Sequence, residues 1–137
     1  MQKHGEEFFR RFEADVIRDF LNRQSSESCV LALGGGVPCN TFLSSDELKA
    51  LGTLVYLDIA PGIAYKRLAA GGIPPFLSGN DPYGKFLSMF EERSLRYAEM
   101  ADLRIKVPQN ITAEDLSDLI FTELTQNKFL NIQAKIG

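Results

Sequence analysis

A short apolar run that ends in three glycines sets the class of fold. Residues 29–33 read Cys-Val-Leu-Ala-Leu and are followed directly by Gly34, Gly35 and Gly36. A continuous apolar run of this length predicts a strand buried on both faces of a parallel sheet, because a half-exposed strand would alternate apolar with polar residues. The glycines then lie at the carboxyl end of that strand, where open α/β folds bind ligands. A tight strand-to-helix turn explains them equally well.

The rest of the chain alternates helical and strand patterns. Ser44 and Glu47 match a capping box, Pro61 is placed for a helix start, and other helices follow from apolar residues at spacings of three and four. The Gly- and Pro-rich stretch 71–84 predicts a long loop of the kind used as a lid. The expected strands are residues 29–33, 53–58 and 103–107, and the expected helices are residues 5–23, 44–51, 61–70, 83–100 and 112–124.

This order predicts one α/β domain over residues 1–137 with a parallel sheet between helical layers. All three expected strands read as buried, yet three strands are too few to cover one another. The sheet therefore lacks neighbours that such strands require.

Charge and composition exclude several classes of partner. The net charge is -3 and the longest Lys/Arg run is Arg10-Arg11, which argues against nucleic acid and against an anionic membrane as partners. No apolar run approaches the ~18 residues of a membrane span. The N-terminal stretch carries acids throughout, unlike a signal peptide, which predicts a cytoplasmic protein. Cys29 and Cys39 lack the spacing of metal ligands, so no metal site is expected from these residues.

Two arginines on predicted helices are candidates for binding a carboxylate. Arg10 lies on the polar flank of the first helix, and Arg93 lies in Glu-Glu-Arg-Ser-Leu-Arg-Tyr on the fourth. A guanidinium group suits this task because it donates two parallel hydrogen bonds to a carboxylate. From the helical pattern alone, the favoured interpretation is that both arginines lie on a solvated helix face and pair with glutamates.

One nucleotide-binding pattern fails in its context. Residues 79–85 fit G-x-x-x-x-G-K, but Phe86 follows where a Ser or Thr should hold magnesium, and no strand precedes the pattern. Pro82 also removes a backbone N–H that such a loop uses to bind phosphate. We do not expect a phosphate site there.

Four segments, taken in order, resemble the shikimate kinase family. Residues 5–13 resemble its G-E-x-x-F-R-x-x-E helix, and residues 30–36 resemble its strand with the triple glycine. Residues 55–58 resemble its V-Y-L-[DE] strand, and residues 92–102 its E-R-x-x-x-Y helix with the A-D exit. The resemblance covers the chain up to about residue 125.

The resemblance implies a three-layer α/β/α fold of the P-loop kinase type. It also implies a kinase that uses ATP and Mg²⁺ and transfers the γ-phosphoryl group of ATP to the 3-hydroxyl of shikimate, in the chorismate pathway of aromatic amino-acid biosynthesis. Carried over by position, Arg10 and Arg93 grip the shikimate carboxylate, while Gly34, Gly35 and Gly36 lie against its ring.

The resemblance further implies a nucleotide side of the site. Residues 71–84 correspond to the lid over the nucleotide, and Gln109 or Asn110 falls near the adenine. The lid of the family carries an Arg in R-P-L-L, whereas residues 73–77 here read Ile-Pro-Pro-Phe-Leu.

The family's first strand, its G-K-[ST] phosphate-binding loop and its second strand with the substrate-binding Asp have no match in these residues. In the family's sheet the first strand lies between those matching residues 29–33 and 54–58, so a gap is expected there. Phosphoryl transfer depends on these phosphate- and metal-binding groups. The chain as given is therefore expected to be N-terminally truncated and inactive alone, with no catalytic residue present.

Three hypotheses account for this pattern. In the first, the chain is the body of a shikimate kinase whose preceding segment is not in the sequence given. In the second, it is a degenerate, non-catalytic relative that binds a small carboxylate or a protein partner. In the third, a separate polypeptide supplies the front half in trans.

Overall fold

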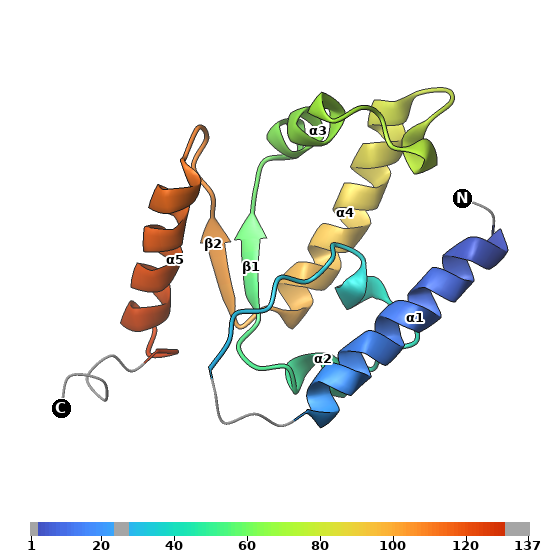
Figure 1. Ribbon diagram of the computed structural model, residues 1–137. Coiled ribbons are helices and arrows are strands. Elements are labelled where there is room, and N and C mark those ends of the chain that lie inside the picture. Colours follow the sequence, from blue (N-terminus) through green and yellow to red (C-terminus); the bar gives the residue numbers. More distant parts are fainter. Residues whose placement is uncertain (1–2, 24–27, 131–137) are drawn as a thin grey trace.

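The computed structural model describes residues 3–23 and 28–130. Figure 1 shows a small parallel sheet with helices on both sides, α5 on one side and the other helices on the other. The α-helices are α1 (Lys3–Asn22), α2 (Ser45–Lys49), α3 (Pro61–Ala70), α4 (Pro82–Met100) and α5 (Ala113–Gln126); the strands are β1 (Val55–Asp58) and β2 (Leu103–Lys106); the 3₁₀ helices are η1 (Val37–Cys39) and η2 (Pro75–Leu77). This helix-rich α/β arrangement is the predicted class.

The sheet pairs β1 with β2 in parallel, with Tyr56 opposite Arg104 and Leu57 opposite Ile105. Tyr56 is buried and its ring meets Tyr97 of α4 edge to face, at 5.3 Å between centroids. Leu57 is 38% exposed on the other face. The prediction of a strand buried on both faces is therefore wrong for β1, because the face that carries Leu57 is only partly covered.

The strand predicted at residues 29–33 does not form. This segment lies without a strand partner in the described part of the chain, and Val30 is fully exposed. A strand is defined by hydrogen bonds to a neighbour. β1 pairs with β2 and not with this segment, so the apolar run stays irregular and leads into the glycines.

The predicted helices form where their signals lie. Ser44 and Glu47 make the expected capping box, Thr112 caps α5 by accepting from the N–H of Asp115 at 3.0 Å, and Pro61 opens α3. The fourth helix begins at Pro82, inside the loop predicted over residues 71–84. The Asp81 carboxylate caps it by accepting from the N–H of Gly84. The connection between α3 and α4 is thus shorter than expected and contains η2.

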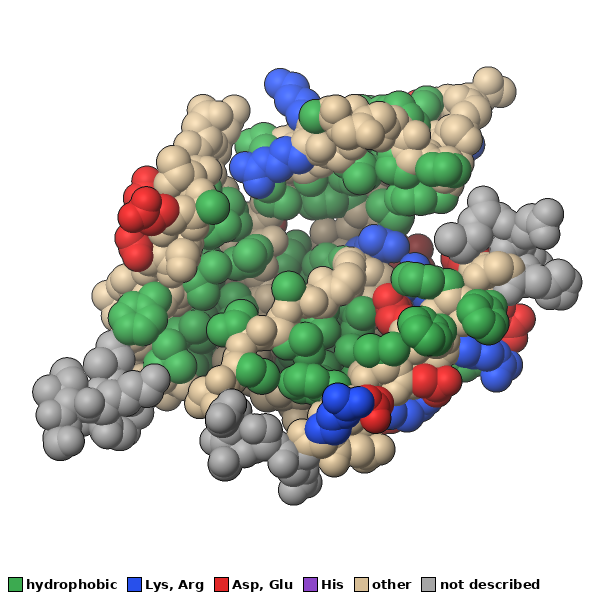
Figure 2. All heavy atoms as spheres, in the orientation of Figure 1, with side chains coloured by type: hydrophobic (Ala, Val, Ile, Leu, Met, Phe, Trp, Pro, Cys, Tyr) green, Lys and Arg blue, Asp and Glu red, His purple; other side chains and the backbone are tan. Residues whose placement is uncertain are grey.

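Helix α1 packs with a different face from the one its phenylalanines indicate. Ala14 and Ile17 are buried in the core, together with Val37, Leu43, Leu48 and Met100. Phe8 and Phe12 are 72% and 59% exposed, so these two phenylalanines of the apolar stripe lie outside the buried face of the helix. Figure 2 shows hydrophobic side chains open over α1 and in the space toward α5. No helix in residues 3–23 or 28–130 is both long and apolar enough to cross a membrane.

Candidate functional site

The three glycines form a turn that enters η1 between α1 and α4 (Figure 1). The N–H of Val37 donates to the carbonyl of Gly34 at 3.0 Å, and the N–H of Cys39 donates to the carbonyl of Gly36 at 3.1 Å. Gly36 is buried and has ordinary helical angles, with φ -87° and ψ -8°. Its backbone angles therefore suit any residue, and what surrounds it decides which side chain fits.

Arg10 of α1 fills the space beside Gly36. A Cβ built on Gly36 would stand 2.7 Å from Cζ and from Nη2 of Arg10. The guanidinium is held there by Glu13, whose Oε1 accepts from Nη1 of Arg10 at 2.9 Å. Both side chains are largely buried, with exposed fractions of 26% and 14%. An absent side chain at Gly36 is thus what lets Arg10 lie against the turn.

Arg93 and Tyr97 of α4 meet the same turn one residue earlier. A Cβ on Gly35 would stand 2.9 Å from Nη1 of Arg93 and 3.2 Å from the Tyr97 hydroxyl oxygen. Tyr97 donates its hydroxyl hydrogen to the carbonyl of Gly35. Burial raises the pKa of Tyr97 above its ordinary value, because an ionised phenolate would be poorly solvated there. No carboxylate in the described residues pairs with Arg93.

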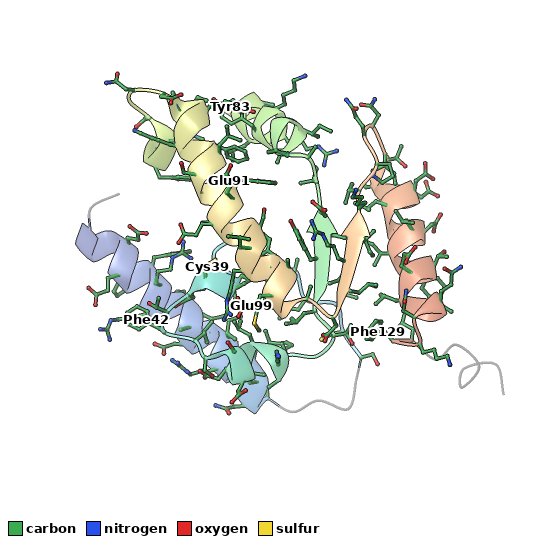
Figure 3. The ribbon with its side chains drawn as sticks, turned by 180° about the vertical axis from the view of Figure 1, so that it is seen from behind. Cys39, Phe42, Tyr83, Glu91, Glu99 and Phe129 are labelled. Atoms are coloured by element: carbon green, nitrogen blue, oxygen red, sulfur yellow. The ribbon has the colours of Figure 1, made fainter. Side chains whose placement is uncertain are left out.

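The two guanidinium groups therefore lie at neighbouring glycines, whose Cα atoms are about 3.8 Å apart across a trans peptide bond. Figure 3 shows Cys39, the last residue of η1, between α1 and α4. Burial raises the pKa of the Cys39 thiol, while the positive charges of Arg93, Arg96 and Arg10 act in the opposite direction. Arg10 is paired with Glu13, so Arg93, which has no carboxylate partner in the described residues, supplies the positive charge left beside backbone that carries no side chains. Such a place can bind a small anion, and a planar carboxylate matches the guanidinium fork.

Two further polar residues hold the turn in place. Arg96 of α4 donates from Nε to the carbonyl of Pro38 at 2.8 Å and from Nη2 to the hydroxyl of Ser45 at 3.0 Å. Asn40, which follows η1, is only 3% exposed and donates to α1. Sequence reasoning missed both as members of the site. Arg96 carried a weak signal, since it lies three residues after Arg93, whereas nothing in the pattern around Asn40 marks it.

The remaining predicted site residue, Asn110, lies elsewhere. It is exposed in the turn between β2 and α5 and has a left-handed φ of 62°. Figure 1 places this turn at the carboxyl end of the two strands, apart from η1. The structure therefore brings Arg10, Arg93 and Gly34 to Gly36 together and leaves Asn110 separate.

The polar side chains of the G-x-x-x-x-G-K pattern are bonded within the protein. Nζ of Lys85 donates to the carbonyl of Ser78 at 2.8 Å, and the Asp81 carboxylate already occupies the start of α4. A phosphate there would meet a carboxylate in place of free backbone N–H groups.

Comparison with known proteins identifies the family. A family model described as shikimate kinase matches residues 1–126. The chain belongs to the shikimate kinase family. The shikimate kinase of Trichormus variabilis is 36% identical over 118 residues, which is 85% of this chain and 61% of that protein. The shikimate kinase of Cupriavidus pinatubonensis is 34% identical over 128 residues, which is 93% of this chain and 64% of that protein.

A solved structure agrees with this family and with its fold. Shikimate kinase from Acinetobacter baumannii in complex with shikimate superposes with a TM-score of 0.78 at 29% identity, covering 93% of this chain and 69% of that one. The fold is thus similar to that of the shikimate kinases, as the motifs predicted. The chain thus covers 61% and 64% of the length of these two curated relatives.

Proposed function

We propose that this chain forms the shikimate-binding part of a shikimate kinase. The observation that carries the proposal is the pair of arginines at neighbouring glycines, Arg10 at Gly36 and Arg93 at Gly35. Arg93 supports it most, because this half-buried residue has no carboxylate partner among the residues described, so a ligand carboxylate would be the counter-charge of its guanidinium.

In the proposed complex the two arginines neutralise the carboxylate and fix one end of shikimate. Gly34 and Gly35 are exposed, so the ring can approach their backbone, while the glycine at position 36 leaves the room that Arg10 fills. Holding the ring by its carboxylate directs its hydroxyls away from α1 and α4. Phosphoryl transfer depends mainly on the orientation of the reactants and on charge stabilisation. These residues contribute to it by orienting shikimate.

The reaction we propose for the complete protein is transfer of the γ-phosphoryl group of ATP to the 3-hydroxyl of shikimate. Membership of the family supports ATP and Mg²⁺ as co-substrate and cofactor. Within the ranges described, no group of three or more His, Cys, Asp or Glu side chains is placed to hold a metal ion. We therefore assign no metal ligand to these residues.

The test is a calorimetric titration of the chain with shikimate. We compare the wild type with Arg10→Ala, Arg93→Ala and, as a matched control, Arg23→Ala, whose side chain is 79% exposed. Because a hydrogen bond to a charged group contributes about 1.5–3 kcal/mol, each site variant should weaken binding by about 10- to 100-fold. Arg23→Ala should bind as the wild type does. Wild-type affinity in Arg93→Ala would contradict the proposed site.

A further inference from the structure

Asn40 is a buried polar residue near the glycine turn, and both the donor and the acceptor of its side-chain amide have partners. It is 3% exposed, and its Nδ2 donates to the backbone carbonyl of Arg10 at 2.9 Å and to Oε1 of Glu13 at 3.1 Å. Its Oδ1 accepts from the N–H of Phe42 at 2.9 Å. When both the NH₂ group and the carbonyl oxygen of a buried amide have hydrogen-bond partners, the amide has one defined orientation, because the donor and the acceptor cannot exchange places.

These contacts reach Arg10 at both of its ends. The Glu13 oxygen that accepts from Asn40 also accepts from Nη1 of Arg10, so the amide and the guanidinium share one carboxylate oxygen. The other branch of the amide fixes the main chain of Arg10 itself. Asn40 thus restrains the backbone of Arg10 and also the Glu13 carboxylate that holds the Arg10 guanidinium.

The same residue is tied to the glycine turn through its backbone. Its N–H donates to the carbonyl of Val37 at 3.1 Å, one residue after Gly36. Asn40 therefore joins the turn that presents the glycines, through its backbone, to the helix that presents Arg10, through its side chain. A shift of either would open the close approach between Arg10 and Gly36.

From this arrangement we propose that Asn40 is a positioning residue that sets the Arg10 guanidinium over Gly36 for carboxylate binding, acting through Glu13. The inference rests on the proposed function for its ligand, although the placement of Arg10 can be measured without one. Residues that orient a binding group in this way influence affinity without touching the ligand.

The principal variant is Asn40→Ser. A serine hydroxyl can still accept from the N–H of Phe42 in a turn of the same kind, but it is too short to reach Glu13 or the Arg10 carbonyl. The substitution thus keeps the local turn and removes the two contacts with α1. Asn127→Ser is the matched control, because Asn127 is exposed and bonds locally to Glu123 at the end of α5.

Two properties are measured on the full chain, with the melting temperature recorded for each variant. The first is shikimate affinity, which should fall by about 5- to 10-fold in Asn40→Ser. The Glu13 carboxylate loses its hydrogen bond from Asn40 in this variant and holds Arg10 less firmly. The second is the rate at which phenylglyoxal modifies Arg10, followed by peptide mass spectrometry with Arg23 as the internal reference. This rate should rise in Asn40→Ser, since a less restrained guanidinium is more accessible, and it should not change in Asn127→Ser.

A second variant places a negative charge at the same position. Asn40→Asp keeps the acceptor for Phe42 but turns a carboxylate toward Glu13, and it should displace Arg10 more strongly than Asn40→Ser. The charged groups around this position are Glu13 and, through it, Arg10 of α1, and Glu92 and Arg96 of α4. Adding Glu13→Gln to Asn40→Asp restores a donor between the two positions, and affinity should recover in part.

The possible results distinguish the role of Asn40 from the proposed function. Unchanged affinity and unchanged Arg10 reactivity in a folded Asn40→Ser protein would overturn the role of Asn40 while leaving the proposed function in place. If wild-type protein fails to bind shikimate, the proposed function is wrong, and the reactivity of Arg10 still decides whether Asn40 positions it. Lower affinity together with faster modification of Arg10 supports both.

Discussion

The guanidinium of Arg10 occupies the volume that a side chain at Gly36 would need. A Cβ on that glycine would stand 2.7 Å from Arg10 Cζ, closer than real Cβ contacts occur. The backbone at Gly36 has ordinary angles, so the requirement for glycine comes from Arg10 and not from the turn itself. Sequence alone could not separate these two explanations for the glycine.

This relationship predicts the effect of Gly36→Ala. The added methyl group meets the far end of a flexible side chain, so the protein should retain its stability within about 0.5 kcal/mol. Arg10 must move, however, and shikimate affinity should fall by about tenfold or more. Calorimetric titration and thermal unfolding measure the two effects.

Gly62→Ala is the matched control for that substitution. Gly62 lies in α3 with open space around its Cα, and alanine there should raise stability by up to about 1 kcal/mol without changing affinity. Equal shikimate affinity in Gly36→Ala and in the wild type would show that Arg10 does not bind the ligand from the position it has in the structure.

Arg96 should matter for stability because it joins α4 to the turn. Arg96→Met keeps the apolar stem and removes the bonds to the Pro38 carbonyl and the Ser45 hydroxyl, leaving the carbonyl without that partner. We expect a loss of about 1–2 kcal/mol in the free energy of unfolding, measured by urea denaturation. Glu99→Ala removes only the 70% exposed partner of Arg96 and should cost less than about 0.5 kcal/mol. Equal effects of the two variants would refute this assignment.

Acid should weaken the contact between α1 and α2. The hydrogen bond from Arg18 lowers the pKa of Glu47 from its ordinary 4.5 to about 2, with a smaller contribution from the backbone at Ser44. A carboxyl whose pKa is lower in the folded state adds stability above its unfolded pKa and loses that contribution as the pH falls through the folded one. The contribution of Glu47 should therefore be complete above pH 4.5 and disappear toward pH 2.

Glu47→Gln tests this dependence because glutamine retains the capping box with Ser44. The variant should melt below the wild type at neutral pH, and the two melting temperatures should converge as the pH approaches 2. Thermal unfolding across this range gives the comparison. A difference that stays constant with pH would mean that the ion pair with Arg18 adds nothing.

The helices and their caps could be predicted because their signals are local. The hydroxyls of Ser44 and Thr112 each satisfy an N–H three residues away, so the residues that form the cap are all visible in the sequence. The strand at residues 29–33 could not be judged in this way, since a strand depends on a partner distant in sequence. An apolar run indicates that a segment prefers to be buried, but it does not show whether a partner strand is present.

The site was predictable in part for a similar reason. Arg10 and Arg93 were identified through family motifs, and the structure brings both to the glycine turn. Asn40 was missed because its role arises from contacts across 30 and 27 positions of sequence with Arg10 and Glu13. The buried face of α1 was misjudged as well, because the Phe8 and Phe12 stripe competes with the smaller residues that pack in the core.

We propose that Arg10 and Arg93 together bind the carboxylate of shikimate. A comparison of the affinities for shikimate and for shikimate methyl ester tests this binding. The ester keeps the ring and hydroxyls but carries no negative charge. Calorimetric titration of the wild-type chain should give an affinity for the ester lower by about 10- to 100-fold, since the charge-assisted hydrogen bonds are lost. Equal affinities for the acid and the ester would contradict the account.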